Sequence, residues 1–153
     1  MSSGSIPSST SIVESAVIQA PLAKVWHLIK LKDLASWWNL VSNVEEVKDS
    51  SNEADVYKVT YKDKSTVVIK QEEHSAIHHY ITYSAVSAEP ALTYSSVYST
   101  IRVYPITSGP MENSTFVEWS ATFSSDADSG VIQDARYKRK EGLADLARAV
   151  GAK

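Results

Sequence analysis

The sequence predicts an α+β fold in which a curved antiparallel sheet packs around one long C-terminal helix. Segments with alternating apolar and polar residues follow one another from about residue 41 to residue 123, as in strands. An amphipathic helical pattern then occupies residues 131–150. A sheet curved around a single helix can leave space that side chains do not fill. A container for a small molecule is therefore the first functional hypothesis.

The segment before these strands predicts one more strand and two short helices. Residues 11–19 are rich in β-branched side chains, which favour a strand. Pro21 follows, and proline suits the start of a helix because its missing N–H is not needed there. Apolar residues then recur at helical spacing up to Ile29, and a second short helix is predicted over residues 32–38.

Six further strands complete a seven-stranded sheet. We predict them over residues 41–47, 55–62, 66–72, 77–84, 93–104 and 114–123. In the last two strands, alternation puts one set of side chains on a covered face and the other set outward. The predicted covered set is Val97, Ser99, Ile101 and Val103 with Val117, Trp119, Ala121 and Phe123.

Composition narrows the possible partners. Apolar residues make up 43% of the chain and charged residues 22%, as in ordinary globular proteins. The net charge of −3 offers no basic surface for nucleic acid, and the absence of cysteine excludes disulfides and thiolate sites. No apolar run approaches the ~20 residues that cross a bilayer, so we expect no stable membrane insertion. We expect residues 1–10 to be a flexible tail, residues 11–153 a single domain, and the protein to be cytoplasmic.

Four stretches, in their order along the chain, resemble a known family. They are APLAKVWHLI after the first strand, QEEHSAIHHYITYS, YSTIRVYP and STFVEWSATF. Over about residues 11–150 the chain resembles the polyketide cyclase/dehydratase and lipid-transport branch of the START-like (SRPBCC) superfamily, which also contains the birch pollen allergen group. The resemblance implies a helix-grip fold, with two short helices after the first strand and seven strands around a long C-terminal helix.

The resemblance also implies which residues would bind a ligand. Residues on the concave face of the sheet and on the facing side of the helix would line an internal cavity, with Trp38 near its entrance. In this sequence the expected ligand-binding residues are Trp38, Tyr57, Val59, Tyr61, Val67, Ile69, His79, Ile81, Tyr83, Val97, Ser99, Ile101, Val117, Trp119, Ala121, Ile132, Ala135 and Arg139.

Candidate acid–base residues come from the polar members of that set. His79 has the parity of the covered face, and a histidine there could act as general acid or base; the alternative is a hydrogen-bonded core or rim histidine. Tyr57 and Tyr83 could donate hydrogen bonds to a carbonyl or phenol. Arg139 could stabilise an enolate, although it could equally lie exposed on the helix. Glu118 falls on the outward parity opposite Arg102, and only a register shift of one residue would turn it inward.

We expect neither a metal nor a cofactor. Among the clustered histidines, His78 and His79 would be neighbours in a strand and point to opposite faces, while His74 would sit in a turn. Zinc needs side chains that converge on one point. The chain also contains no glycine-rich loop that would cradle phosphates.

Three functions fit these observations. The first is binding of a hydrophobic small molecule (a lipid, a polyketide or a polycyclic aromatic compound) in the cavity. The second is a cofactor-free polyketide-type cyclase, dehydratase or isomerase that uses His79, Tyr57, Tyr83 and Arg139. The third is a regulator whose loop closes over a ligand. Residues 85–92 are the nearest candidate for such a loop.

Overall fold

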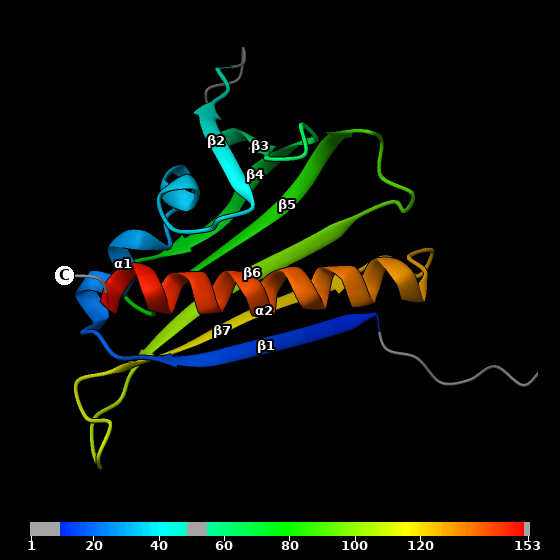
Figure 1. Ribbon diagram of the computed structural model, residues 1–153. Helices are drawn as coiled ribbons and strands as arrows, with labels where there is room; N and C mark the ends of the chain where they lie inside the picture. The colour runs from blue at the N-terminus through cyan, green and yellow to red at the C-terminus, as the bar shows by residue number, and fades with distance from the viewer. Residues whose placement is uncertain (1–9, 49–54, 152–153) are drawn as a thin grey trace, which may run out of the picture.

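The computed structural model describes residues 10–48 and 55–151 and shows the predicted α+β helix-grip architecture (Figure 1). Residues 1–9 of the predicted tail lie outside the described residues. Seven antiparallel strands form one sheet in the order β1-β7-β6-β5-β4-β3-β2. The elements are β1 (Ser11–Ile18), α1 (Leu22–Leu28), the 3₁₀ helix η1 (Leu31–Ser36), β2 (Val41–Glu46), β3 (Val56–Tyr61), β4 (Thr66–Ser75), β5 (Tyr80–Glu89), β6 (Val97–Pro105), β7 (Thr115–Phe123) and α2 (Ser129–Gly151).

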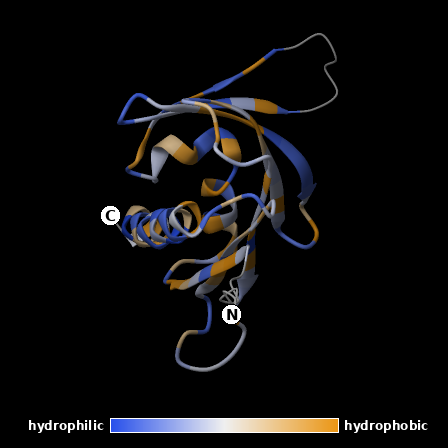
Figure 2. Cartoon of the chain, turned by 90° about the vertical axis from the view of Figure 1, so that its right-hand side faces the viewer, coloured by the Kyte–Doolittle hydropathy of each residue, from blue (hydrophilic) through white to orange (hydrophobic). Residues whose placement is uncertain are grey.

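The sheet bends around α2, which Figure 2 views nearly end-on. In Figure 1, α2 runs in front of β6 and β7 and beside β1, while β2, β3 and β4 stand away from it. The short helices α1 and η1 lie near the C-terminal end of α2. Within the described part of the chain, no such short helix lies over the N-terminal half of α2.

The core lies between the concave face of the sheet and the buried stripe of α2. Ile81, Ile101 and Trp119 are paired neighbours across β5, β6 and β7, and each is at most 1% exposed. The predicted alternation in the last two strands is confirmed, since the whole covered set is buried. Most buried positions of α2 are three, four or seven residues apart along one stripe, as a helix that covers a core requires. The buried positions are Ile132, Arg139, Gly142, Leu143, Asp145, Leu146 and Val150.

Hydrogen bonds fasten the short helices to α2 and to each other. The buried carboxylate of Asp145 accepts hydrogen bonds from the backbone N–H of Asn39 (2.9 Å) and from Arg148. The indole N–H of Trp37 donates to the carbonyl of Leu28 at 2.7 Å. Because these bonds hold the segment after η1 against the helix, the two neighbouring tryptophans, Trp37 and Trp38, are fixed inside the core.

The prediction that His79 belongs to a strand is wrong. β4 continues to Ser75 and β5 begins only at Tyr80, so His79 lies in the turn between them, with φ 59°. The hydroxyl of Ser75 accepts a hydrogen bond from the backbone N–H of His78 at 2.9 Å. This N–H is therefore bonded within the turn and not to a neighbouring strand. Two shifts of register between β4 and β5, which the alternation did not reveal, leave one extra residue in β5 (Val86) and one in β4 (Glu72).

The connection between β5 and β6 also differs from its prediction. β5 extends to Glu89, so residues 85–89 are strand and not part of a closing loop, and β6 begins at Val97 instead of Thr93. The residues before Val97 leave the sheet because Ser95 and Ser96 hydrogen-bond to side chains beyond β7 instead of to β5. None of the described helices is long and apolar enough to span a bilayer.

Candidate functional site

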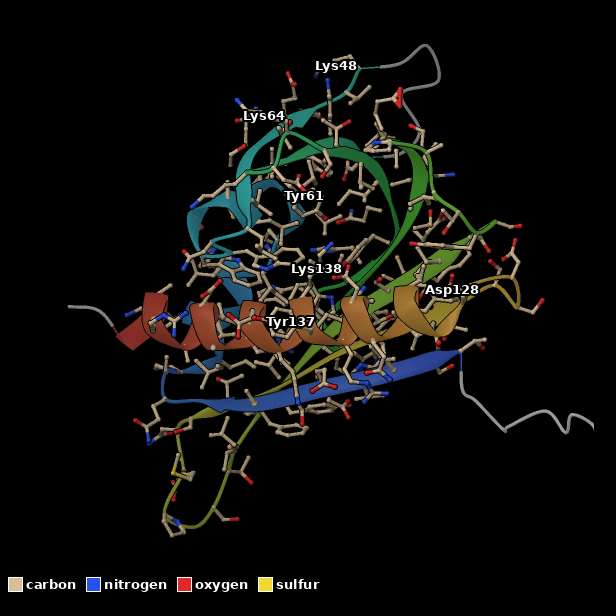
Figure 3. All side chains as sticks on the ribbon, turned by 45° about the vertical axis from the view of Figure 1, so that its right-hand side comes forward. Lys48, Tyr61, Lys64, Asp128, Tyr137 and Lys138 are labelled. Atoms are coloured by element: carbon tan, nitrogen blue, oxygen red, sulfur yellow. The ribbon has the colours of Figure 1, made fainter. Side chains whose placement is uncertain are left out.

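A pocket of about 450 Å³ lies between the N-terminal half of α2 and the edge formed by β3, β4 and the β5–β6 connection. We call it the helix–sheet pocket. In Figure 3, Tyr61 on the sheet and Lys138 on α2 lie on opposite sides of this gap. The lining residues are Trp38, Leu40, Tyr61, Lys62, Asp63, Ser65, Thr66, Val67, Ala88, Glu89, Pro90, Ala91, Leu92, Thr93, Tyr94, Phe123, Val131, Asp134, Ala135, Lys138 and Arg139.

Aromatic residues close the inner end of the pocket. Trp38 packs edge-to-face against Trp119, with ring centroids 4.8 Å apart, and against Tyr61 at 6.0 Å. It also stacks on Trp37 at 6.1 Å. Trp119 thus plugs the centre of the fold, and the helix–sheet pocket lies beside it on the side of Ala135. The predicted space between sheet and helix is present as an open pocket beside this plug.

The β5–β6 connection forms one side of the pocket and is fixed in place by Asp126. The carboxylate of Asp126 accepts hydrogen bonds from the backbone (3.1 Å) and the hydroxyl (2.6 Å) of Ser95. Hydrogen bonds from Ser124 and Ser95 lower the pKa of Asp126 to about 2, so it is ionised at neutral pH. Tyr94, the residue before this clamp, packs edge-to-face on Phe123 at 5.5 Å. The connection therefore presents Tyr94 to the pocket from an anchored backbone.

Arg139 is the charged group buried in the pocket wall, at 9% exposure. Its guanidinium donates to the hydroxyl of Ser99 (2.8 Å) and to the carbonyl of Ala135 (3.2 Å), and it lies 5.4 Å from the centre of the Trp119 ring. Its Nε is buried without an acceptor. Within the described part of the chain, no ion pair includes Arg139.

Two tyrosines flank this arginine as neutral hydrogen-bonding groups. Burial raises the pKa of the Tyr61 phenol well above its ordinary value, and Tyr83 adds to the rise while Arg139 opposes it. Burial also raises the pKa of Tyr94, again against the effect of Arg139. Both phenols therefore keep their protons at neutral pH. They offer O–H groups on a lining that is apolar over most of its inner surface.

The pocket mouth carries charges of both signs. Lys138 pairs with Asp134 at 2.8 Å on the exposed face of α2. On the sheet side, hydrogen bonds from Ser65 lower the pKa of the exposed Asp63. Because Lys62 and Glu89 are also exposed at this rim, the mouth has no single dominant sign of charge.

The structure divides the residues expected to bind a ligand into three groups. Those that line the helix–sheet pocket are Trp38, Tyr61, Val67, Ala135 and Arg139. Most of the others are buried in the core or behind the pocket wall: Val59, Ile69, Ile81, Tyr83, Val97, Ser99, Ile101, Val117, Trp119, Ala121 and Ile132. Tyr57 and His79 lie elsewhere. Tyr57 borders a small hollow with Lys30 and His74, and the His79 ring packs against Trp26 at 5.2 Å.

The candidate acid–base residues therefore do not converge. Of His79, Tyr57, Tyr83 and Arg139, only Arg139 lines the pocket. The Tyr83 hydroxyl accepts a hydrogen bond from the Trp119 indole at 3.0 Å, inside the core. Among the described residues, no group of three His, Asp or Glu side chains could hold a metal ion. Glu118 keeps its outward parity opposite Arg102 and accepts a hydrogen bond from Tyr104 at 3.0 Å.

Sequence reasoning missed the contribution of the β5–β6 connection, from Ala88 to Tyr94. The sequence did contain an indication of this contribution, because the large side chains Leu92 and Tyr94 follow Pro90 in a segment between strands. Large apolar side chains in such a connection are expected to pack against the rest of the protein. Phe123 was predicted on the covered face but was not included among the ligand-binding residues.

A second hollow has a similar volume of about 460 Å³, at Val17, Lys24 and Gly151 beside the C-terminal end of α2. Its cationic residue, Lys24, is exposed and reaches across to the carbonyl of Val150 at 3.2 Å. It lacks the buried charge and the aromatic wall of the helix–sheet pocket. The helix–sheet pocket is thus the better candidate for a ligand.

Comparisons with known proteins agree with this geometry. Residues 9–151 match the model of a family described as polyketide cyclase/dehydrase and lipid transport. An uncharacterised protein from Bacillus thuringiensis is 25% identical, with a TM-score of 0.75 over 91% of this chain and 97% of its own. The protein XoxI from Bacillus cereus is also 25% identical, with a TM-score of 0.75 over 91% of this chain and 94% of its own.

A protein from Nitrosospira multiformis is 19% identical, with a TM-score of 0.76 over 93% of this chain and 97% of its own, and shares the fold. No curated protein matches the sequence.

Proposed function

Because this chain belongs to the polyketide cyclase/dehydrase and lipid transport family, we propose that it binds a hydrophobic small molecule in the helix–sheet pocket. The family supports ligand binding or a cyclase role in general.

The observation that carries the proposal is the apolar pocket of about 450 Å³ beside the Trp119 plug. This volume is within the range of pockets that bury drug-sized ligands, roughly 300–1,000 Å³. Trp38, Val67, Leu92 and Ala135 offer apolar surface, and the phenol of Tyr61 offers a hydrogen bond. A few polar groups on an apolar wall are typical of sites that bind hydrophobic ligands and fix their orientation.

The geometry favours binding over the cyclase alternative. General acid–base catalysis needs its groups within hydrogen-bonding reach of one substrate atom. His79 contacts Trp26, Tyr57 borders another hollow, and Tyr83 is bonded to Trp119. A substrate in the helix–sheet pocket would meet only Arg139 of the four proposed residues.

Filling the pocket from α2 tests the proposal. Ala135 is half-buried and lines the pocket, so Ala135→Trp places an indole in the space the ligand needs. The neutral fluorescent probe N-phenyl-1-naphthylamine is expected to bind the wild-type protein, and its dissociation constant should rise at least tenfold in this variant.

Ala144→Trp is the matched control, because Ala144 is exposed on the same helix and does not line the pocket. It should bind the probe as the wild type does. Thermal melts establish that all three proteins are folded. Equal probe binding by both tryptophan variants, or no binding by a folded wild type, would contradict the proposal.

A further inference from the structure

Arg139 is a buried cation, and the fold supplies hydrogen-bond acceptors for only some of its N–H donors. The guanidinium has five N–H donors, and the structure supplies acceptors at Ser99 and Ala135. Both acceptors are neutral oxygens. A buried cation is stabilised best by an anion, because neutral hydrogen bonds recover only part of the hydration that burial removes.

Two carboxylates near this part of α2 are already bound to other cations. Glu14, on the concave side of β1, pairs with Arg136 at 3.2 Å. Asp134 pairs with Lys138 at 2.8 Å. Arg136 and Lys138, which lie close to Arg139 on α2, therefore hold these two carboxylates. Among the described residues no carboxylate pairs with Arg139, so its charge stays unpaired in the pocket wall.

We propose that the ligand carries an acidic group, of the carboxylate class, which pairs with Arg139 while its apolar body lies against Tyr61 and Tyr94. This inference rests on the proposed binding function. The arginine is seated by Ser99 and by the face of the Trp119 ring, so its position is set before a ligand arrives. An arginine so oriented can bind a carboxylate through two parallel N–H···O bonds.

The charges of the mouth do not compete strongly with Arg139 for an acidic group. The rim carries Lys62 and Lys138 together with Asp63, Glu89 and Asp134, and Lys138 is already paired with Asp134. Rim charges are also screened by solvent, whereas a buried charge is screened much less. An acidic ligand therefore gains most when its carboxylate reaches Arg139 and its apolar end faces the mouth.

Two competitors that differ only in their head group test this inference. Decanoate and decanol are compared for displacement of N-phenyl-1-naphthylamine at neutral pH. Decanoate should displace the probe from the wild-type protein at a concentration about tenfold or more below that of decanol. Arg139→Met should abolish this difference by weakening decanoate alone, with decanol unchanged.

Stability separates a ligand-binding role of Arg139 from a purely structural one. Replacement of a buried charge by an apolar side chain of similar length is often neutral or stabilising, so Arg139→Met should melt at the wild-type temperature or above. Arg139→Gln is the second variant, because its amide can still donate to Ser99 without a charge. It should lose the decanoate preference as well.

Lys140→Gln is the control, because Lys140 is an exposed cation on the same helix and does not line the pocket, and it should leave the ratio of the two competitors within about twofold of the wild type. Equal displacement by both competitors in the wild type would overturn the inference, as would a preference for decanoate that survives in Arg139→Met and Arg139→Gln. Failure of the probe itself to bind a folded wild type would instead contradict the proposed function.

Discussion

Trp119→Ala is expected to lower the free energy of unfolding by about 3–5 kcal/mol, the usual cost of truncating a fully buried tryptophan. Trp119 is 1% exposed and contacts the rings of Trp37 and Trp38 with centroids 5.9 and 4.8 Å away. The substitution removes this packing and deprives the Tyr83 hydroxyl of its donor. Urea unfolding of both proteins measures the loss.

Trp26→Ala provides the matched control, because Trp26 is only half-buried and lies against His74 and His79 at the edge of the fold. Its cost should be clearly smaller. If the two substitutions cost the same, or if Trp119→Ala costs less than about 1 kcal/mol, Trp119 does not form the central plug described above.

Gly142→Ala is expected to destabilise the protein by about 1–3 kcal/mol, although alanine is the better helix former by about 1 kcal/mol. A Cβ at Gly142 would lie 2.8 Å from Cζ3 of Trp119 and 3.1 Å from the indole nitrogen of Trp38. Both rings are buried and cannot move aside without disturbing the core. Glycine is therefore required here for the close approach of α2 to the tryptophans.

Two comparisons isolate this steric cause, again by urea unfolding. Gly130→Ala meets only the Asp128 carboxylate, at 3.4 Å, and should be neutral or stabilising. In a Trp119→Phe background the main clash is absent, so Gly142→Ala should lose most of its cost. An unchanged cost in that background would mean that contact with Trp119 is not responsible.

The strands were predictable where one face is buried and the chain alternates regularly. Val117 and Trp119 in β7, and Ile101 in β6, are buried as the period-two pattern predicts. The prediction was wrong at His79, because a turn closed by the Ser75 side chain contains neither glycine nor proline. Local side-chain hydrogen bonds of this kind leave little trace in hydrophobic patterning.

The candidate site was less predictable than the fold, because it depends on which end of α2 the short helices cover. The sequence placed Tyr61, Ala135 and Arg139 on facing surfaces, and these residues do meet at the helix–sheet pocket. It left open whether Arg139 is exposed or buried. It also could not indicate that Leu92 and Tyr94 approach α2, since the path of a connection depends on tertiary contacts.

We infer that packing at the Trp119 plug directs a ligand to the helix–sheet pocket, beside the N-terminal half of α2. A crystal structure of the protein with N-phenyl-1-naphthylamine tests this claim most directly. The probe is expected between Tyr61, Tyr94 and Ala135, in contact with Trp38. Density for the probe at the hollow near Val17 and Lys24, or on the outer face of the sheet, with the helix–sheet pocket empty, would contradict the account.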